Sequence, residues 1–233
     1  GRSDMALQFD GSSDHVLVNG YKGITGSKQR SMSAWIKTTK GDATILNWGM
    51  DATGQKWTFR VQTGNGTSGA IRVEVNGGAV VGNTVVNDDQ WHHVAAVLPA
   101  GATDVNKIRL YVDGVYDGTS YIAPEPINTA SSQDVRIGND FANRYFQGLI
   151  DDVRIYDIGL SDSDVAAIYN NGGESNTRTN APGYVGTPFT YQVQATRGPT
   201  SYAAGPELAA NGLTLNTTTG EITGTPTAEG DFN

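Results

Sequence analysis

The stretch that decides the fold is "QGLIDDVRIYDIGLSDSDVAAIY", residues 147–169, which reads as a β-strand running into a short helix. Apolar and polar residues alternate over 147–156, the two-residue period of a strand with one buried face. Ser161 stands where a helix N-cap belongs, and acidic side chains follow it in the favourable first turn. The stretch therefore predicts a strand followed by a helix over 161–170.

Two adjacent carboxylates stand in the middle of this predicted strand. Strict alternation places Asp151 on the aliphatic face that it shares with Val153 and Ile155. Asp152 falls on the opposite face beside Arg154, where ordinary polar contacts are expected. A bare buried carboxylate is costly, so Asp151 is expected to be protonated, paired with a cation, held by backbone N–H donors, or coordinated to a metal ion.

Similar alternating runs, each bounded by turn residues, precede this stretch along the chain. They cover residues 5–10, 15–20, 31–38, 43–49, 56–63, 70–78, 90–98, 107–118, 133–140 and 146–157. Within them, Asp113–Gly114 is a strong signal for a type I′ hairpin turn. Many short strands and a single helix predict an all-β sandwich.

The alternation of apolar and polar residues stops after the predicted helix, so residues 1–170 are expected to form one domain. Residues 171–183 are polar, rich in Asn and Gly and without periodicity, which predicts a linker. Residues 184–233 return to alternating runs, and Asn216–Gly220 predicts a hairpin turn. The sequence stops as another strand begins, so we expect this second β-module to be truncated at its C-terminal end.

Composition excludes several classes of partner and site. The formal net charge of -8 argues against nucleic acid or an anionic membrane as partner, and neutral or cationic ligands fit better. The absence of cysteine excludes disulfides and thiolate metal sites. No apolar run approaches the ~18 residues of a membrane span, so membrane insertion is not expected. The composition is typical of a secreted or cell-surface bacterial protein, and we expect a monomer.

Several motifs, in this order and spacing, carry a family resemblance. They are "ALQFDGSSDHVLV", "SMSAWIKT", "QWHHVA", "LYVDGV", "IGND" and "FQGLIDDVRIYDIGLSDSDVAAIY". Together they resemble the laminin-G-like, concanavalin A-like domains of bacterial surface and polysaccharide-degrading proteins. This resemblance implies a concanavalin A-like jelly-roll sandwich over residues 1–170. Residues 184–233, with "GTPFTYQV" and "NGLTLNTTTGEITGTP", resemble part of an Ig-like, cadherin-like repeat.

The same resemblance implies a structural calcium ion. In jelly rolls of this class the first and last strands are often neighbours, and Asp10 and Asp14 stand at the end of the first predicted strand. The implied Ca²⁺ site joins Asp10, Asp14 and Asp151, with backbone carbonyls completing an oxygen coordination shell. The residues leave an alternative open, in which Asp151 accepts backbone N–H bonds and Asp10 only opens a turn.

The sequence lacks the patterns that hydrolytic catalysis needs. His92 and His93 point to opposite faces of one strand and cannot chelate the same ion. No Gly-x-Ser-x-Gly elbow is present. Glycosidases use two carboxylates, and the related jelly-roll glucanases carry a Glu-x-Asp-x-x-Glu or similar strand motif. Here Glu74 has no second acid within reach on its strand, so the chain is not expected to be an enzyme. A pair of Asp residues from distant strands is the alternative that the sequence leaves open.

Carbohydrate binding needs aromatic platforms with polar groups at their edges, because a sugar offers an apolar face and a ring of hydroxyls. The candidate ligand-binding residues are Trp48, Trp57, Asn139, Asp140, Asn143, Arg144 and Tyr145. Core packing is the alternative for the tryptophans. Loop 139–145 is favoured because its polar residues interrupt a connection between strands, and loops commonly carry function.

These observations predict a non-catalytic carbohydrate-binding or adhesion module of a larger extracellular bacterial protein. Its ligand is expected to be a glycan or a surface protein. Two alternatives remain open, since a fold does not define a function. One is a structural spacer domain in a surface array, and the other is an accessory domain of a polysaccharide-degrading enzyme.

Overall fold

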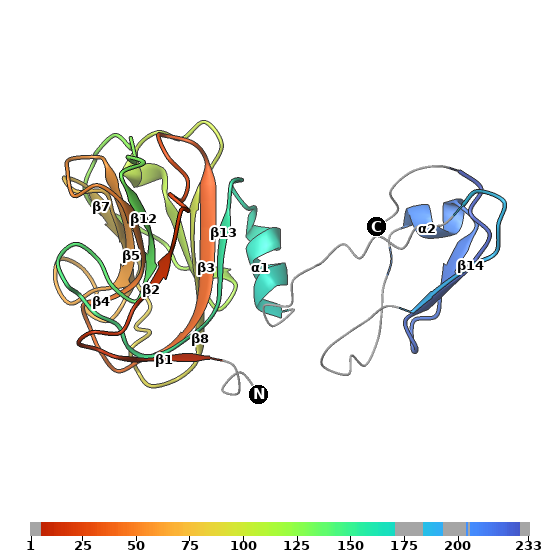
Figure 1. The fold of residues 1–233 in the computed structure, drawn as a ribbon, viewed down its shortest axis with the longest axis horizontal. Coiled ribbons are helices and arrows are strands. Elements are labelled where there is room, and N and C mark those ends of the chain that lie inside the picture. The colour runs from red at the N-terminus through yellow and green to blue at the C-terminus, as the bar shows by residue number, and fades with distance from the viewer. Residues whose placement is uncertain (1–5, 171–183, 193–203, 205, 229–233) are drawn as a thin grey trace. The chain divides into compact units, whose positions relative to one another are not determined.

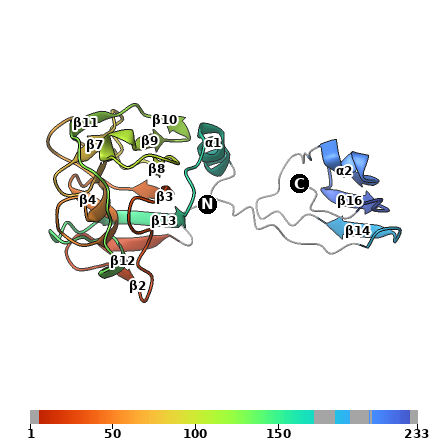
Figure 2. The ribbon, with the colours of Figure 1, turned by 90° about the horizontal axis from the view of Figure 1, so that it is seen from above.

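The computed structural model describes residues 6–170, 184–192, 204 and 206–228. The chain divides into two compact units, residues 1–173 and 174–233 (Figure 1). The first unit contains two antiparallel sheets that stack as layers, as Figures 1 and 2 show from two directions. The predicted all-β sandwich is therefore confirmed.

The two sheets take strands from distant parts of the sequence. The six-stranded sheet has the order β1 (Leu7–Asp10), β13 (Gln147–Tyr156), β3 (Arg30–Lys37), β8 (His92–Leu98), β9 (Arg109–Val112) and β10 (Val115–Tyr116). The seven-stranded sheet has the order β11 (Ser120–Ala123), β7 (Ala79–Val81), β6 (Ile71–Glu74), β5 (Lys56–Val61), β4 (Ala43–Gly49), β12 (Gln133–Ile137) and β2 (Val16–Val18). A short 3₁₀ turn, η2 (Val105–Lys107), precedes β9.

The core lies between the sheets and is built from the inward faces of both. Its largest fully buried apolar side chains include Met32, Ile36, Ile45, Leu46, Trp48, Trp57, Phe59, Ile71, Leu98 and Phe146. Trp48 of β4 and Trp57 of β5 are directly paired in register, and their rings stack with centroids 5.9 Å apart. The centre of the sandwich is therefore filled by aromatic side chains from adjacent strands.

The pair of carboxylates in β13 forms a β-bulge. Asp151 pairs with Trp35 of β3, whereas Arg154 pairs with Ser33, so β13 carries one extra residue between these two pairs. Asp152 is within this bulge and has a positive φ of 50°. Its carboxylate accepts a hydrogen bond from Arg154 Nε at 2.7 Å, the polar contact expected for it.

The bulge corrects the predicted position of Asp151. Ile150, Val153 and Ile155 all contribute to the core, although strict alternation would place Ile150 on the face opposite the other two. The extra residue shifts the phase of the strand, so the half-buried Asp151 faces away from the core. There its Oδ1 accepts the backbone N–H of Asp152 at 2.8 Å. Because Asp151 does not lie in the core, neither a metal ion nor a buried cation is needed to stabilise its charge.

The predicted helix is confirmed as α1 (Asp162–Asn170). Ser161 caps the helix. Its hydroxyl accepts the backbone N–H of Asp164 at 3.2 Å, and its own backbone N–H donates to the Asp164 side-chain carboxylate at 2.8 Å. Val165 joins a small apolar cluster with residues of β8 and β9. The helix thus covers the outer face of the six-stranded sheet (Figure 1). Within the described part of the chain, no helix is long and apolar enough to cross a membrane.

The second unit contains a small antiparallel sheet. Its elements are β14 (Phe189–Gln192), α2 (Pro206–Ala210), β15 (Leu213–Leu215) and β16 (Glu221–Gly224), with β16 central. The predicted hairpin turn is confirmed, since Gly220 N donates to Asn216 O at 2.8 Å. The predicted linker, 171–183, lies outside the described residues. An Ig-like module stays a prediction, because three short strands do not distinguish it from other β-folds.

Candidate functional site

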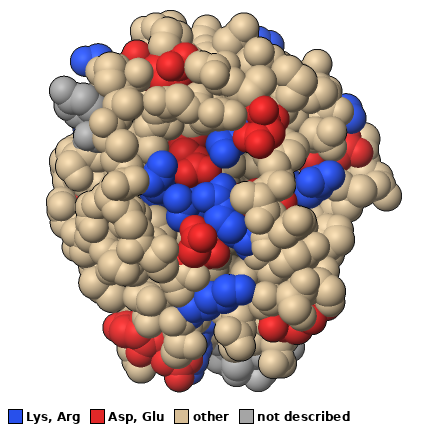
Figure 3. Space-filling view, turned by 90° about the vertical axis from the view of Figure 1, so that its left-hand side faces the viewer, with Lys and Arg blue, Asp and Glu red and all other residues tan. Residues whose placement is uncertain are grey.

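The outer face of the seven-stranded sheet carries a group of cations around one carboxylate. Arg72 and Glu74 lie two residues apart on β6 and therefore share a face of the sheet. Arg60 on β5 is paired directly with Arg72. Lys56 at the start of β5 and Arg144 from the loop before β13 complete the group. We call these five residues the Glu74 cluster; Figure 3 shows Lys and Arg side chains gathered near the centre of this face.

Both oxygens of Glu74 are shared among the four cations. Oε1 lies 2.6 Å from Arg144 Nη2 and 3.0 Å from Lys56 Nζ. Oε2 lies 3.1 Å from Arg60 Nη2 and 3.0 Å from Arg72 Nε. Glu74 is only 6% exposed. It is therefore a nearly buried anion that holds four basic side chains in place.

The protonation state of the Glu74 cluster is fixed by these contacts. Burial by itself would raise the pKa of Glu74, but the hydrogen bond from Arg144 and the charges of Arg60, Arg144 and Lys56 lower that pKa far below its usual range. Burial would likewise lower the pKa of Arg144, yet its hydrogen bonds to Glu74 and Asp140 raise it. Glu74 is thus ionised at physiological pH and cannot act as a general acid.

Two further carboxylates, Asp42 and Asp140, form ion pairs with arginines of the cluster. Asp42 Oδ1 lies 2.6 Å from Arg60 Nη1. Asp140, which is 2% exposed, accepts hydrogen bonds from Arg144 Nε at 2.7 Å and Thr44 Oγ1 at 2.9 Å. These bonds tie loop 139–145 to the sheet and so fix the position of the Arg144 guanidinium.

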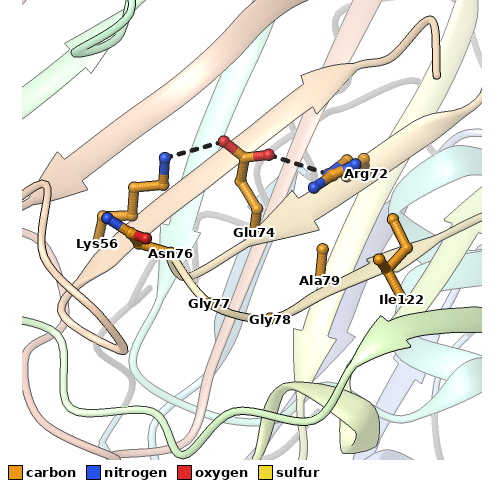
Figure 4. A pocket seen from close by; sticks show the side chains of 8 residues that line it. All are labelled: Lys56, Arg72, Glu74, Asn76, Gly77, Gly78, Ala79 and Ile122. Carbon is orange, nitrogen blue, oxygen red and sulfur yellow. Dashed lines mark ion pairs between the residues drawn. The ribbon is translucent and has the colours of Figure 1, made fainter. Parts of the chain in front are cut away.

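A hollow of about 280 Å³ opens beside the cluster (Figure 4). It is lined by Lys56, Arg72, Glu74, Asn76, Gly77, Gly78, Ala79 and Ile122. Charged groups from β5 and β6 lie on one side of this pocket, while the exposed Ile122 of β11 lies on another. The pocket therefore combines fixed hydrogen-bonding groups with an apolar wall, and its volume is just below the range of ligand sites, ~300–1,000 Å³.

The turn between β6 and β7 shapes one side of the pocket. Asn76 and Gly77 have φ values of 59° and 95°, as a type I′ hairpin turn requires. Val75 N donates to Gly78 O at 3.0 Å and closes the turn. A Cβ on Gly78 would lie 2.5 Å from the Cβ of Glu125, so glycine is needed there. The tight turn places bare backbone in the pocket wall next to the Asn76 amide.

The two tryptophans predicted to bind ligand are core residues instead. Trp48 and Trp57 are both 0% exposed. The indole nitrogen of Trp48 donates to Ile24 O at 3.1 Å, and that of Trp57 lies 2.9 Å from Met32 Sδ. Both side chains occupy inward positions of adjacent strands. The prediction that they contact ligand is therefore wrong, and the core alternative is correct.

Loop 139–145 contributes unequally to the site. Asp140 and Arg144 reach the Glu74 cluster. Asn139 is buried and its Oδ1 accepts the backbone N–H of Asp140 at 2.6 Å. Asn143 is exposed at a positive φ of 56°, and Tyr145 is half-buried with its ring 6.5 Å from that of His15. None of these five residues lines the pocket.

Sequence reasoning missed the pocket residues that come from strands. The pocket residues Lys56, Arg72 and Ile122 were not among its candidates, and neither was Arg60 of the adjoining cluster. A signal was present, since "KWTFRV" and "IRVE" place basic residues and Glu74 on the polar faces of two consecutive strands. Those faces converge because β5 and β6 are hydrogen-bonded neighbours.

The acidic residues proposed for calcium do not converge. Asp10 does end β1, and β1 does pair with β13, as expected. However, Asp10 is opposite Gln147, four positions along β13 from Asp151, which is roughly 13 Å at the usual strand rise. Among the described residues, no group of three or more His, Asp or Glu side chains could hold a metal ion.

The Asp10 carboxylate is instead fully used within its turn. Its Oδ1 accepts the backbone N–H groups of Ser12 and Ser13 at 2.8 Å and of Asp14 at 3.0 Å. These backbone bonds hold the pKa of Asp10 well below its usual value. Asp14 Oδ2 in turn accepts the backbone N–H of Asp10 at 3.1 Å. The three residues Asp10, Asp14 and Asp151 do not fit a shared calcium ion.

We expect added calcium to leave the melting temperature of chelator-treated protein unchanged, because a ligand stabilises only by binding the folded state. Thermal unfolding with EDTA, and again with millimolar calcium, measures this. The matched variant is Asp151→Asn, which should melt like the parent under both conditions. A calcium-dependent rise that this substitution removes would restore the calcium site predicted from the resemblance.

Comparison with known proteins agrees with the sandwich fold. Residues 10–166 match the family model described as the concanavalin A-like lectin/glucanases superfamily, so the chain belongs to that superfamily. No curated protein matches the chain by sequence.

Two solved structures show the same fold. Domain 4 of AbnA, a GH43 extracellular arabinanase from Geobacillus stearothermophilus in complex with arabinotriose, matches at TM-score 0.56 and 20% identity, covering 72% of this chain and 79% of that one. The CBM40 of the Ruminococcus gnavus IT-sialidase, bound to α2,3 sialyllactose, matches at TM-score 0.54 and 14% identity, covering 70% of this chain and 95% of that one.

Proposed function

We propose that this chain is a non-catalytic carbohydrate-binding module of a secreted or cell-surface protein, and that it binds a glycan in the pocket beside the Glu74 cluster. The observation that carries the proposal is the pocket itself, where rigidly held polar groups face an apolar wall. Sugars offer matching chemistry, because hydroxyls ring the edge of an apolar face. The two similar structures, which were solved with an oligosaccharide bound, support this proposal.

The pocket residues divide the binding work by their chemistry. Lys56, Arg72 and Asn76 supply hydrogen-bond donors for hydroxyl or ring oxygens. Ile122, which is 41% exposed, supplies an apolar surface for the face of a sugar ring. Glu74 acts mainly through the cations, since both of its oxygens are already engaged by them.

The non-catalytic part of the proposal rests on the state of the carboxylates. Hydrolysis of a glycosidic bond needs one protonated carboxyl group and a second ionised one flanking the scissile bond. Three other acids contact the cluster: Asp42 and Asp140 are paired with arginines, and Asp51 lies 3.4 Å from Lys56 Nζ. The lowered pKa of Glu74 keeps that group ionised. Glu74 is therefore not poised to donate a proton.

A second candidate is an accessory role within a polysaccharide-degrading enzyme. The domain of AbnA that matches this chain is itself one part of an arabinanase. In that case the module would bind the polysaccharide and a catalytic domain elsewhere in the longer protein would cleave it. The binding site would be the same pocket.

Glycan-array screening followed by calorimetry tests the proposal. Ile122→Ala is expected to weaken binding roughly fivefold, because it removes about 1 kcal/mol of apolar contact with the sugar. The matched control is Leu17→Ala, which truncates an equally exposed aliphatic residue on β2, at the opposite edge of the same sheet. Absence of binding to every glycan, or equal affinities for the two variants, would contradict the proposal.

A further inference from the structure

Arg72 has the fewest partners of the four cations in the Glu74 cluster. Its Nε lies 3.0 Å from Glu74 Oε2, but without the alignment of a hydrogen bond. Within the described residues, no hydrogen bond or ion pair engages its two terminal nitrogens. Its side chain is 14% exposed and lines the pocket, as Figure 4 shows. Arg72 therefore presents unused guanidinium donors to whatever occupies the pocket.

The charges around the pocket are unevenly compensated. Asp42 binds Arg60 and Asp140 binds Arg144, so these two arginines have carboxylates of their own in addition to Glu74. Among the described residues, Arg72 has an ion pair only with the shared Glu74, and Asp42 attracts its charge from farther away. Burial lowers the pKa of Arg72, and the charges of Glu74 and Asp42 raise it again only in part because Arg60 and Arg144 repel the charge of Arg72. An anion placed in the pocket would relieve this repulsion.

Lys56 adds a second cation to the same pocket. Its Nζ lies 3.0 Å from Glu74 Oε1 and 3.4 Å from the exposed Asp51. In Figure 4, Lys56 and Arg72 lie on either side of Glu74. A carboxylate above Glu74 could therefore contact both cations. Arginine matches a carboxylate with two parallel hydrogen bonds, which gives geometric selectivity as well as attraction.

We propose that the sugar bound in this pocket carries a carboxylate, as uronic and sialic acids do, and that Arg72 and Lys56 bind that group. The inference rests on the proposed function and narrows it to a ligand class. It differs from the expectation that the net charge of -8 suggests, which is a neutral or cationic ligand. The cations of the pocket, and not the net charge of the chain, determine which ligand charge is attracted. Charges beyond about 10 Å are screened by salt, whereas the pocket cations would contact the ligand directly.

The first test changes the ligand and leaves the protein intact. Binding of sialyllactose is compared with lactose, and an oligogalacturonate is compared with its methyl ester, in each case by calorimetry. We expect at least one acidic probe to bind roughly tenfold or more tightly than its uncharged partner, a ratio expected for a charge-assisted hydrogen-bond pair. Raising the salt concentration should weaken the acidic probe selectively.

The second test changes the protein. Arg72→Gln should abolish the preference for the acidic probe, and Arg72→Lys should restore only part of it because the two-pronged geometry is lost. Arg109→Gln is the matched control, since Arg109 lies on the six-stranded sheet and also pairs with a carboxylate, that of Asp162. It should bind the acidic probe like the parent.

The outcomes separate this inference from the proposed function. Equal binding of acidic and neutral probes, or a preference that survives in Arg72→Gln, would overturn the carboxylate inference while leaving carbohydrate binding in place. Failure of all four probes, together with an empty glycan array, would overturn both. The methyl-ester comparison needs no variant, so the inference stays testable even if Arg72→Gln does not fold.

Discussion

Replacing Glu74 with Gln is expected to lower the free energy of unfolding by about 3 kcal/mol, the range in which breaking a buried ion pair falls. The substitution keeps the shape of the side chain but removes the anion shared by four cations, which then repel one another. Urea-induced unfolding measures the change. Asp51→Asn is the matched control, because Asp51 is exposed and lies 3.4 Å from only one of these cations, Lys56.

The control should cost less than about 1 kcal/mol, as surface ion pairs do. A Glu74→Gln protein as stable as the Asp51→Asn protein would contradict the central role assigned to this carboxylate. Stability to acid provides an independent readout. The folded-state pKa of Glu74 lies below its unfolded value of about 4.3, so its contribution is complete above that pH and is lost as the pH falls toward the folded pKa. Glu74→Gln should flatten the decline in stability below about pH 5.

Replacing Trp57 with Ala is expected to lower the free energy of unfolding by about 3–5 kcal/mol. The side chain is fully buried, its ring stacks on Trp48, and the guanidinium of Arg30 lies 4.8 Å from the ring centroid. Truncation would leave a cavity and uncover a buried cation. Chemical denaturation measures the loss, and Trp57→Phe should show a smaller one because it keeps most of the apolar volume.

Glycan affinity distinguishes a core role of Trp57 from a role in ligand contact. In conditions where the Trp57→Phe protein is folded, its affinity for glycan should equal that of the parent, because the pocket lies on the opposite face of the sheet. A variant that keeps its stability and loses binding would show that the tryptophan contacts the sugar after all.

The fold was predictable because its signals are local. Alternation marked the long strands, and the Ser161 cap and the Asp113–Gly114 turn had their expected geometry. The short strands β7 and β11 were missed, since three or four residues barely establish a period. The bulge at Asp152 was also missed, because an extra residue in a strand shifts the pattern without leaving a composition signal of its own.

The site was less predictable because it depends on strand order. Alternation shows that Arg72 and Glu74 share a face, but it does not show that Arg60 is opposite Arg72 or that Arg144 returns from a distant loop. Indole side chains pack in cores as readily as they bind sugars, so residue type alone misassigned Trp48 and Trp57. Loop 139–145 was a better choice, since it supplies Asp140 and Arg144 to the cluster.

The ion pairs of the Glu74 cluster would also lower the entropic cost of the proposed ligand binding. A flexible cation that must be immobilised by its ligand loses about 0.5–1.5 kcal/mol of side-chain freedom. Lys56 and Arg72 are already held against Glu74 on adjacent strands, so most of that loss has occurred during folding. The proposed ligand would therefore need few contacts and no loop closure. Removing the charge of Glu74 would release Lys56 and Arg72 from their ion pairs and so lower the affinity for the ligand.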